Sequence, residues 1–521
     1  MAVSRFQFDC VSALRDEEWR SHIRWPRSLA ATERTNRTGW QLAWDYIRSR
    51  PEKQREVLML VGGRISAQLL ALSEAARVVA RAAELDWIVE GGPPAVRYLI
   101  DGVNYGDGSG LVTTPFKGIA SISYLPFRII ARSLMLTPPR AWQKLPFNSD
   151  AIAINHNPLM HEYSSLLGKA VRFHHAEDFY RSVQKTAYRE SPVSIEDIAI
   201  EFSDLFVETE RLPEIYLARY RHLAASFIRA DLLRAATDVA KARNARDLPA
   251  SIWIGSSGYY PARLIAQEVR RRGGSVTGFE HGWGAAVEDI IEPLAFGELG
   301  YADHYVAATD LSAELFRKSP ALNIAPPGCG EIFESVPQSP RPAEEPFTLR
   351  NKDRHNIVYA PTIISGFRQI SPPNLPDPVY LDWQFRVCEA FRELSVDFCC
   401  RPHPEGFYRG QPHPLAAIDA ASPIPFERLM PKADIFVFDW RQSTTFGRAL
   451  CSNKPIILFN TGVTPFTAEI DRSIRERCTV LDIQYDEENR PLISSDLLRL
   501  AIDEASRKRI DPSFFQKLMR F

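Results

Sequence analysis

The chain has 521 residues, a formal net charge of −1, 45% hydrophobic and 24% charged residues. This length exceeds what one hydrophobic core supports, so we expect about two to four domains. The composition excludes a disordered chain. The balanced charge excludes the strong basic excess that is typical of nucleic-acid-binding proteins, so no nucleic-acid partner is expected.

The termini and the cysteines indicate the compartment. Met1–Arg27 lacks the apolar core of a signal peptide, which spans about 7–15 residues. The sequence contains no run of about 18 apolar residues, so no transmembrane helix is expected. The seven cysteines are odd in number and form no C-x-x-C pair, which favours free thiols in a reducing compartment. We expect a cytoplasmic protein without a metal site.

In chain order, the first half of the sequence combines a helical N-terminal extension with alternating strands and helices. Helical spacing of apolar residues predicts helices over Pro213–Arg243, where one break is allowed, and over Ala262–Arg272. Short apolar runs predict five strands: Glu56–Val61, Ala151–Asn155, Ser251–Gly255, Ser275–Phe279 and His304–Ala308.

A stretch rich in proline and charge, residues 336–353, predicts a linker between two domains, 1–335 and 354–521. After it, helices are expected over Trp383–Leu394 and Ser443–Cys451. The expected strands of this half are Asn356–Ala360, Phe398–Arg401, Asp434–Phe438, Lys454–Phe459 and Thr479–Ile483. Continuous apolar strands that alternate with helices indicate an α/β fold with parallel sheets covered on both faces, that is, two Rossmann-like domains.

Ligands of such sheets bind at the carboxyl ends of the strands, so the residues that follow each strand carry the functional prediction. In the first half, Glu280 and His281 follow a strand and precede glycines that allow a tight turn. A carboxylate there can act as base, nucleophile or electrostatic stabiliser. The small-residue turn Gly255–Tyr260 contacts a ligand under one interpretation, but we favour a simple tight turn.

In the second half, Arg401 and His403 follow a strand, and two prolines fix the backbone around the imidazole. This pair suits an anionic phosphate. His413 repeats the His-Pro dipeptide but follows no strand, so it ranks lower.

Three hydroxyl residues, Ser443, Thr444 and Thr445, stand where a strand ends and a helix begins. Ser443 suits the N-cap position. Hydroxyl and N–H groups at a helix start also bind phosphate, and an N-cap is compatible with that role. In the N-terminal region, the glycine-rich loop Asn104–Gly110 presents Asp107 as a further catalytic candidate, although most such loops are simple turns.

Together these segments resemble GT-B glycosyltransferases, and most closely the bacterial capsule and O-antigen Kdo transferases. The likeness is carried by VTGFEHGWG, CRPHPEG and QSTTFGRALCSNKPIILFNTGVTPF, and it spans roughly Ser251–Phe466. Two residues depart from the family pattern: His281 replaces an Asp, and Arg448 stands where a Glu is expected.

The resemblance implies a CMP-activated sugar, such as Kdo or a related ulosonic acid, as donor substrate and a glycan or glycolipid as acceptor, with no separate cofactor. His403, Ser443 and Thr444 would then bind the donor phosphate. Glu280 would lie at the reaction centre, either facing an oxocarbenium-like carbon or removing a proton from the acceptor.

Other interpretations stay open. A CDP-alcohol phosphotransferase would also use a His-Gly motif, a non-catalytic nucleotide- or carbohydrate-binding protein would bind without turnover, and a sugar-nucleotide epimerase would share the fold. The basic aromatic segments Trp19–Arg27 and Arg507–Phe521 suit peripheral contact with the inner face of the cytoplasmic membrane. A docked C-terminal helix explains the second segment equally well.

Overall fold

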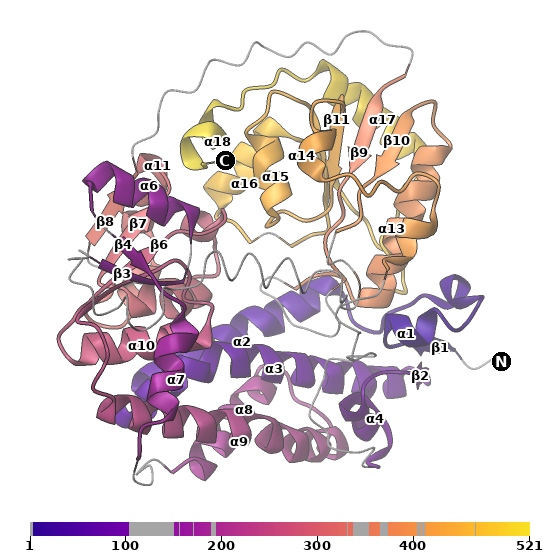
Figure 1. Ribbon diagram of the computed structural model, residues 1–521. Helices are drawn as coiled ribbons and strands as arrows, with labels where there is room; N and C mark the ends of the chain where they lie inside the picture. Colours follow the sequence, from indigo (N-terminus) through magenta and orange to yellow (C-terminus); the bar gives the residue numbers. More distant parts are fainter. Residues whose placement is uncertain are drawn as a thin grey trace.

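The computed structural model describes residues 4–103, 151–155, 157–169, 171–188, 194–330, 332–336, 354–364, 373–403, 407, 412–463 and 465–520. Two parallel sheets, one of six strands and one of five, organise this part of the chain (Figure 1). The α/β class that the sequence predicts is therefore confirmed. The predicted loop with Asp107 lies outside the described residues, and so does the predicted linker apart from Val336.

The six-stranded sheet has the order β4-β3-β5-β6-β7-β8, with every neighbouring pair parallel. Its strands are β3 (Ala151–Asn155), β4 (Val171–Phe173), β5 (Ser251–Ile254), β6 (Ser275–Phe279), β7 (His304–Ala307) and β8 (Ile332–Ser335). The helices associated with this sheet are α6 (Pro158–Leu167), α7 (Ala176–Gln184), α10 (Tyr260–Arg271), α11 (Asp310–Lys318) and α12 (Ala321–Ile324). Four of the predicted strands are confirmed here.

The five-stranded sheet has the order β10-β9-β11-β12-β13, and its pairs are also parallel. Its strands are β9 (Asn356–Tyr359), β10 (Asp397–Cys400), β11 (Ile435–Phe438), β12 (Ile456–Asn460) and β13 (Thr479–Asp482). The associated helices are α13 (Asp377–Arg392), α14 (Phe426–Leu429), α15 (Thr444–Leu450), α16 (Ala468–Arg477), α17 (Ser495–Arg507) and α18 (Ser513–Leu518). All five strands predicted for this half are confirmed.

Counted along the chain, both sheets begin with the order 2-1-3-4-5. In doubly wound sheets of this order, ligands bind where the strand order reverses, beyond the carboxyl ends of the first and third strands. These positions lie between β3 and β5 in one sheet and between β9 and β11 in the other. Of the predicted loops, those with Ser443 after β11 and with Gly255–Tyr260 after β5 lie at these positions. Glu280 and His281 follow β6, one strand beyond β5, and Arg401 follows β10, at the edge of its sheet.

A helical extension packs beside the first sheet. It contains α2 (Leu29–Ser49), α3 (Glu52–Glu84), α4 (Pro94–Asp101), α8 (Glu196–Glu208) and α9 (Glu214–Asn244). In Figure 1, α3 and α9 run side by side beneath the two sheets, and they are in extensive contact. The helix α9 is unbroken, so the break that the sequence allowed does not occur.

The predicted strand Glu56–Val61 is wrong, because these residues belong to α3. The apolar run continues through the helix, and its glycines meet packed neighbours: a Cβ at Gly62 would lie 2.7 Å from Cδ1 of Ile47. The length and composition of α3 are those of a helix that could cross a membrane, which the sequence analysis did not expect. However, 72% of its apolar window is buried in the protein, as in the core helix of a soluble protein.

Each end of the described chain packs against the opposite half of the protein. Near the N-terminus, the 3-10 turn Trp19–His22 follows β1 (Arg5–Gln7) and α1 (Cys10–Ala13), and β1 pairs with β2 (Ile88–Glu90). The guanidinium of Arg20 in this turn binds Asp382 and Glu389 of α13. At the other end, α18 packs against α11 of the first sheet (Figure 1).

These contacts explain why the segments at the two ends are rich in aromatic residues. Trp19 and Trp25 are buried, and so are Phe515, Leu518 and Met519. These side chains pack inside the protein, so the docked C-terminal helix is observed. Peripheral membrane contact stays a prediction without these residues to support it.

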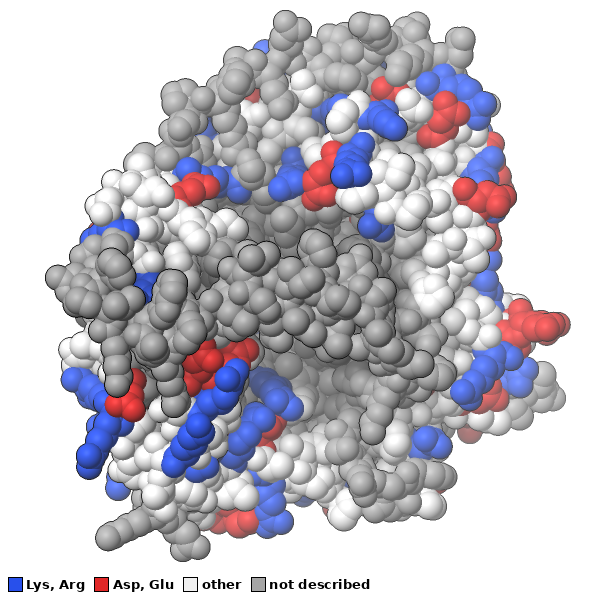
Figure 2. All heavy atoms as spheres, viewed as in Figure 1, with Lys and Arg blue, Asp and Glu red and all other residues white. Residues whose placement is uncertain are grey.

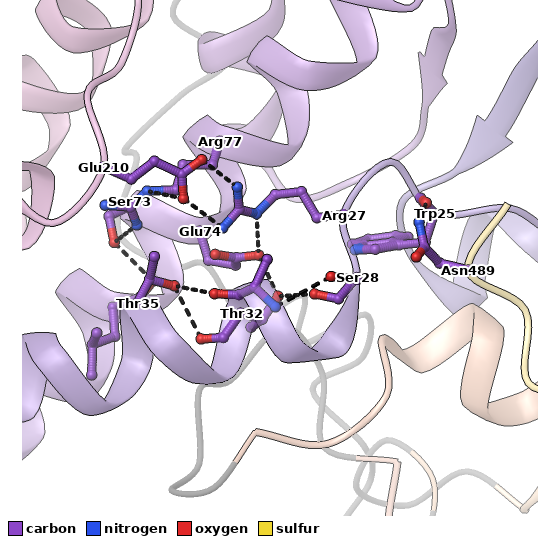
Figure 3. A network of polar contacts seen from close by, with 12 residues as sticks. Trp25, Arg27, Ser28, Thr32, Thr35, Ser73, Glu74, Arg77, Glu210 and Asn489 are labelled. Carbon is purple, nitrogen blue, oxygen red and sulfur yellow. Dashed lines mark hydrogen bonds and ion pairs between the residues drawn. The ribbon is translucent and has the colours of Figure 1, made fainter. Parts of the chain in front are cut away.

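A buried ion network joins the helices of the extension (Figure 3). The guanidinium of Arg27 donates to Glu74 at 2.9 Å and to both carboxylate oxygens of Glu210 at 2.6 and 2.9 Å. Thr32 adds a hydrogen bond of 2.7 Å to Glu74. Arg77 donates to the Phe206 carbonyl at 2.6 Å. The network thus connects α2, α3 and the segment that follows α8.

On the face shown in Figure 2, acidic and basic side chains alternate over the described surface, in agreement with the balanced net charge. All seven cysteines lie within the described ranges and are free thiols.

Candidate functional site

The candidate site is built around the loop that follows β6. Glu280, its first residue, is 7% exposed. Its Oε2 accepts hydrogen bonds from the Ala308 N–H and the Ser312 hydroxyl, each at 2.7 Å. Burial raises the pKa of Glu280, and these hydrogen bonds oppose the rise. One oxygen of this carboxylate therefore anchors the start of α11, a role that the sequence did not indicate.

His281 is the more open group of the predicted pair, with a side chain that is 46% exposed. Its Nε2 lies 3.4 Å from the Ser256 hydroxyl, and its Nδ1 lies 3.6 Å from Oε2 of Glu298. The pairing of β5 with β6 explains the first contact, because Ile254 is opposite Gly278 and the loops leave the sheet side by side.

Asn157 holds these two loops together. Its side-chain N–H group donates to the carbonyls of Gly255 at 3.0 Å and of Glu280 at 2.9 Å. Asn157 is buried and also caps α6, because its Oδ1 accepts from the Leu159 N–H. Sequence reasoning missed this residue; the only local signal was an Asn before a proline at a helix start.

Three carboxyl groups gather in this loop and the connection after it. Burial raises the pKa of Glu280 and of Glu298, and raises the pKa of Glu288 to about 7. Glu298 ends a π-helical turn, Leu294–Glu298, a feature that is frequent at functional sites. Perturbed carboxyl groups next to an exposed imidazole are a pattern of catalytic sites. Neither Glu288 nor Glu298 belongs to a motif, so sequence analysis missed both.

The loop that follows β11 forms the facing half of the site. Ser443 is the N-cap of α15, and its hydroxyl accepts from the Phe446 N–H at 3.1 Å. Thr445 donates to the same hydroxyl at 3.1 Å, and Thr444 is exposed. The N-cap prediction is confirmed; a phosphate-binding role for these hydroxyls stays a prediction.

The two strand-end loops touch. The indole N–H of Trp283 donates to the Ser443 carbonyl at 2.9 Å. The Gln442 amide donates to Glu288 at 3.0 Å, and Glu288 forms an antiparallel bridge with Phe466. The first and second halves of the chain therefore meet at the residues that follow β6 and β11.

Small pockets flank this contact. One, with about 260 Å³ of empty space, lies along the Glu280–Gly284 loop and the C-terminal residues Leu518–Arg520. The other, also about 260 Å³, lies along Asp439–Gln442 and the end of β12. The space in each that a water-sized sphere can enter is only about 10 Å³, which is room for about one water molecule and far below the roughly 300–1,000 Å³ of a typical small-molecule site.

A buried polar cluster fixes the end of β11. Asp439 accepts hydrogen bonds from the Tyr359 hydroxyl at 2.5 Å and the Tyr380 hydroxyl at 3.0 Å. Burial raises the pKa of Asp439 to about 6, and the tyrosine hydrogen bonds oppose the rise. Both tyrosines are buried, so these hydrogen bonds fix the Asp439 carboxylate at the end of β11.

Arg401 and His403 follow β10, which β9 separates from β11. They therefore lie at the same end of the sheet as Ser443 but two strands away. The guanidinium of Arg401 donates to the carbonyl of Pro402 next to it. Nearby His413 is buried, and burial lowers its pKa to about 4.

Among the residues that the structure describes, no group of three or more His, Cys, Asp or Glu side chains is placed to hold a metal ion. Of the predicted site residues, the structure connects Glu280 and His281 to Ser443 through Trp283. No protein-family model matches the chain, and no curated protein matches it significantly. The resemblance to glycosyltransferases therefore rests on the quoted residues alone.

Proposed function

We propose that this protein is a GT-B-type glycosyltransferase that uses a nucleotide-activated sugar, with a CMP-sugar as the first donor to test. The observation that carries the proposal is the direct contact between the strand-end loops of two parallel sheets, where Trp283 binds Ser443. Transfer from a nucleotide donor needs a site for the reacting hydroxyl and a site for the departing phosphate next to each other.

In this proposal the acceptor binds on the His281 side. The bond between the anomeric carbon and the donor phosphate breaks, the acceptor oxygen bonds to that carbon, and the acceptor proton passes to His281 Nε2. The half-exposed imidazole suits this role better than Glu280, whose Oε2 already accepts two hydrogen bonds. Glu280 would contribute its negative charge near the developing positive centre.

The donor phosphate would lie against the hydroxyls of Ser443, Thr444 and Thr445, as the family resemblance implies. Arg401 and His403 would offset the charge of the nucleoside monophosphate as it leaves.

Titration calorimetry with CMP, CDP, UDP, UMP and GDP tests the proposal. Wild type is compared with Ser443→Ala and with Ser494→Ala, a matched control. Ser494 caps α17 as Ser443 caps α15, with its hydroxyl 3.2 Å from the Leu497 N–H. Loss of either cap costs about 1 kcal/mol of stability. Only Ser443→Ala should weaken nucleotide binding.

Selective binding of CMP that Ser443→Ala abolishes would support a cytidine-activated donor. Release of CMP from a CDP-alcohol instead of from a CMP-sugar would favour the phosphotransferase. Preference for UDP or GDP would overturn the donor assignment. If no nucleotide binds, the transferase proposal fails.

A further inference from the structure

We propose that Glu298 is a positioning residue that holds His281 in its Nδ1–H tautomer, and that the Ser256 hydroxyl occupies the place of the acceptor hydroxyl at Nε2. The catalytic part of this inference rests on the proposed function. The positioning part does not, because it concerns the geometry of the protein alone.

The chemistry of the two contacts assigns the tautomer. An ionised carboxylate only accepts hydrogen bonds, and a neutral imidazole carries one N–H. Glu298 faces Nδ1, so in the ionised form of Glu298 that the proposal requires the proton belongs on Nδ1, and Nε2 is left with a lone pair. That lone pair faces Ser256, which can donate its hydroxyl proton. The distances of 3.6 and 3.4 Å are long, as is common before a substrate binds.

Glu298 is placed to stay in this position. It ends the π-helical turn, its side chain is 17% exposed, and its carbonyl accepts from the Ser257 hydroxyl at 3.4 Å. Two cationic groups, His281 and Arg263, act on the pKa of this carboxylate. Burial raises its pKa, whereas the charges of His281 and Arg263 lower it. Glu280 and Glu288 add negative charge nearby.

Ser256 is better suited to hold a place than to act as a nucleophile. Its oxygen already accepts the Gly258 N–H at 3.1 Å, in a turn that ties the hydroxyl to its own backbone. If its hydroxyl donates to Nε2, the residue reproduces the hydrogen bond that an acceptor alcohol would make. An entering acceptor would then replace Ser256 at Nε2.

The experiment measures the tautomer directly. Full-length protein is labelled with ¹³C and ¹⁵N in its 11 histidines, and the His281 signal is assigned by its loss in His281→Gln. Spectra are recorded at pH 8.5, above the ordinary titration range of imidazole. We expect wild type to show the Nδ1–H tautomer. Glu298→Gln should shift His281 toward Nε2–H, because the neutral amide lacks the charge that favours a proton on Nδ1 and can itself donate to that nitrogen.

Two variants serve as controls. Glu268→Gln removes another buried carboxyl from the same half, but its partners are Arg271 and Arg272 at the far end of α10, so the His281 signal should not change. Ser256→Ala removes the placeholder and should preserve the Nδ1–H tautomer. An Nε2–H tautomer in wild type, or an unchanged tautomer in Glu298→Gln, would overturn the inference.

Activity gives a second readout. Once a donor is identified, Glu298→Gln should lower kcat by about 10–100-fold with little change in KM, because orientation matters most in the transition state. The Nδ1–H tautomer without glycosyl transfer would sink the proposed function and leave the positioning role intact. Stoichiometric labelling of Ser256 by a fluorophosphonate would overturn its placeholder role and indicate a nucleophile.

Discussion

Two polar clusters in this molecule shift the pKa of carboxyl groups in opposite directions. In the helical extension, two arginines and two glutamates are matched (Figure 3). Burial raises the pKa of Glu210, but hydrogen bonds from Arg27 outweigh it and the pKa falls below its usual value. At the end of β6, burial raises the pKa of Glu280, Glu288 and Glu298 with one imidazole nearby.

The difference separates structure from function. A matched network stabilises its ionised form, and its hydrogen bonds are short and its cations buried. An excess of buried acid is unfavourable for the fold, and such excess is most often retained where a reaction needs it. We therefore assign the first cluster to holding the extension together, and we propose that the second serves the chemistry of the site.

The largest effect is expected in the extension. Replacement Arg27→Met removes the guanidinium that donates to the Glu74 carboxylate, which is 4% exposed, and leaves the Thr32 hydrogen bond and the charge of Arg77 to offset it. Breaking a buried ion pair from one side costs about 3–5 kcal/mol, because the remaining charge is buried without compensation. Urea denaturation followed by tryptophan fluorescence measures the loss.

The control is Arg221→Met, which breaks an exposed pair with Asp204 that has similar hydrogen-bond lengths of 2.9 and 3.1 Å. Exposed pairs contribute about 0–1 kcal/mol. Equal losses for the two variants would show that the buried network is not a structural support.

The sequence predicted nine of the eleven strands in the two large sheets, because continuous apolar runs between helices have few alternatives. It missed β4 and β8, which are the two edge strands of the six-stranded sheet. The error at Glu56–Val61 shows the limit: a run of six apolar and polar residues fits a strand or one part of a long helix. Its assignment depended on packing against distant residues such as Phe296, which the sequence does not show.

The site was predictable only in part, for a related reason. Glu280 and His281 could be found because they directly follow a strand. Glu298 and Asn157 could not, because neither stands in a motif and both reach the site through the fold. The closeness of Ser256 to His281 follows from the β5–β6 register, which pairs Ser251 with Ser275.

The second prediction concerns the pH dependence of stability, which distinguishes the two clusters. Burial raises the pKa of Glu288 from 4.5 to about 7. The stability that the protonated group contributes is therefore complete below pH 4.5 and is lost as the pH rises through 7. Glu288→Gln removes this dependence, so the variant should become more stable than wild type above pH 7, by at most about 3 kcal/mol.

Thermal unfolding of both proteins between pH 5 and pH 8 gives the difference. Because Asp439 and other groups titrate in both, only the difference between the two profiles is informative. Glu504→Gln, on the exposed face of α17, should leave the profile unchanged. If wild type instead becomes increasingly more stable than Glu288→Gln above pH 7, Glu288 does not belong to the cluster of buried carboxyl groups at the end of β6.

The smallest effect tests whether the candidate site depends on the contact between the two halves of the chain. A Cβ at Gly447 would lie 2.9 Å from Cδ1 and 3.0 Å from Nε1 of the Trp283 indole. Gly447→Ala should therefore push Trp283 away from Ser443, at a cost of about 1–3 kcal/mol of stability, and weaken nucleotide binding.

The matched background is Trp283→Leu, in which the indole is absent and the added methyl group has room. There Gly447→Ala should cost much less, and the difference between the two backgrounds gives the coupling energy of the contact. Thermal unfolding of the four proteins measures it. Equal costs in both backgrounds would mean that Gly447 is required for another reason, and that the two strand-end loops do not depend on their contact.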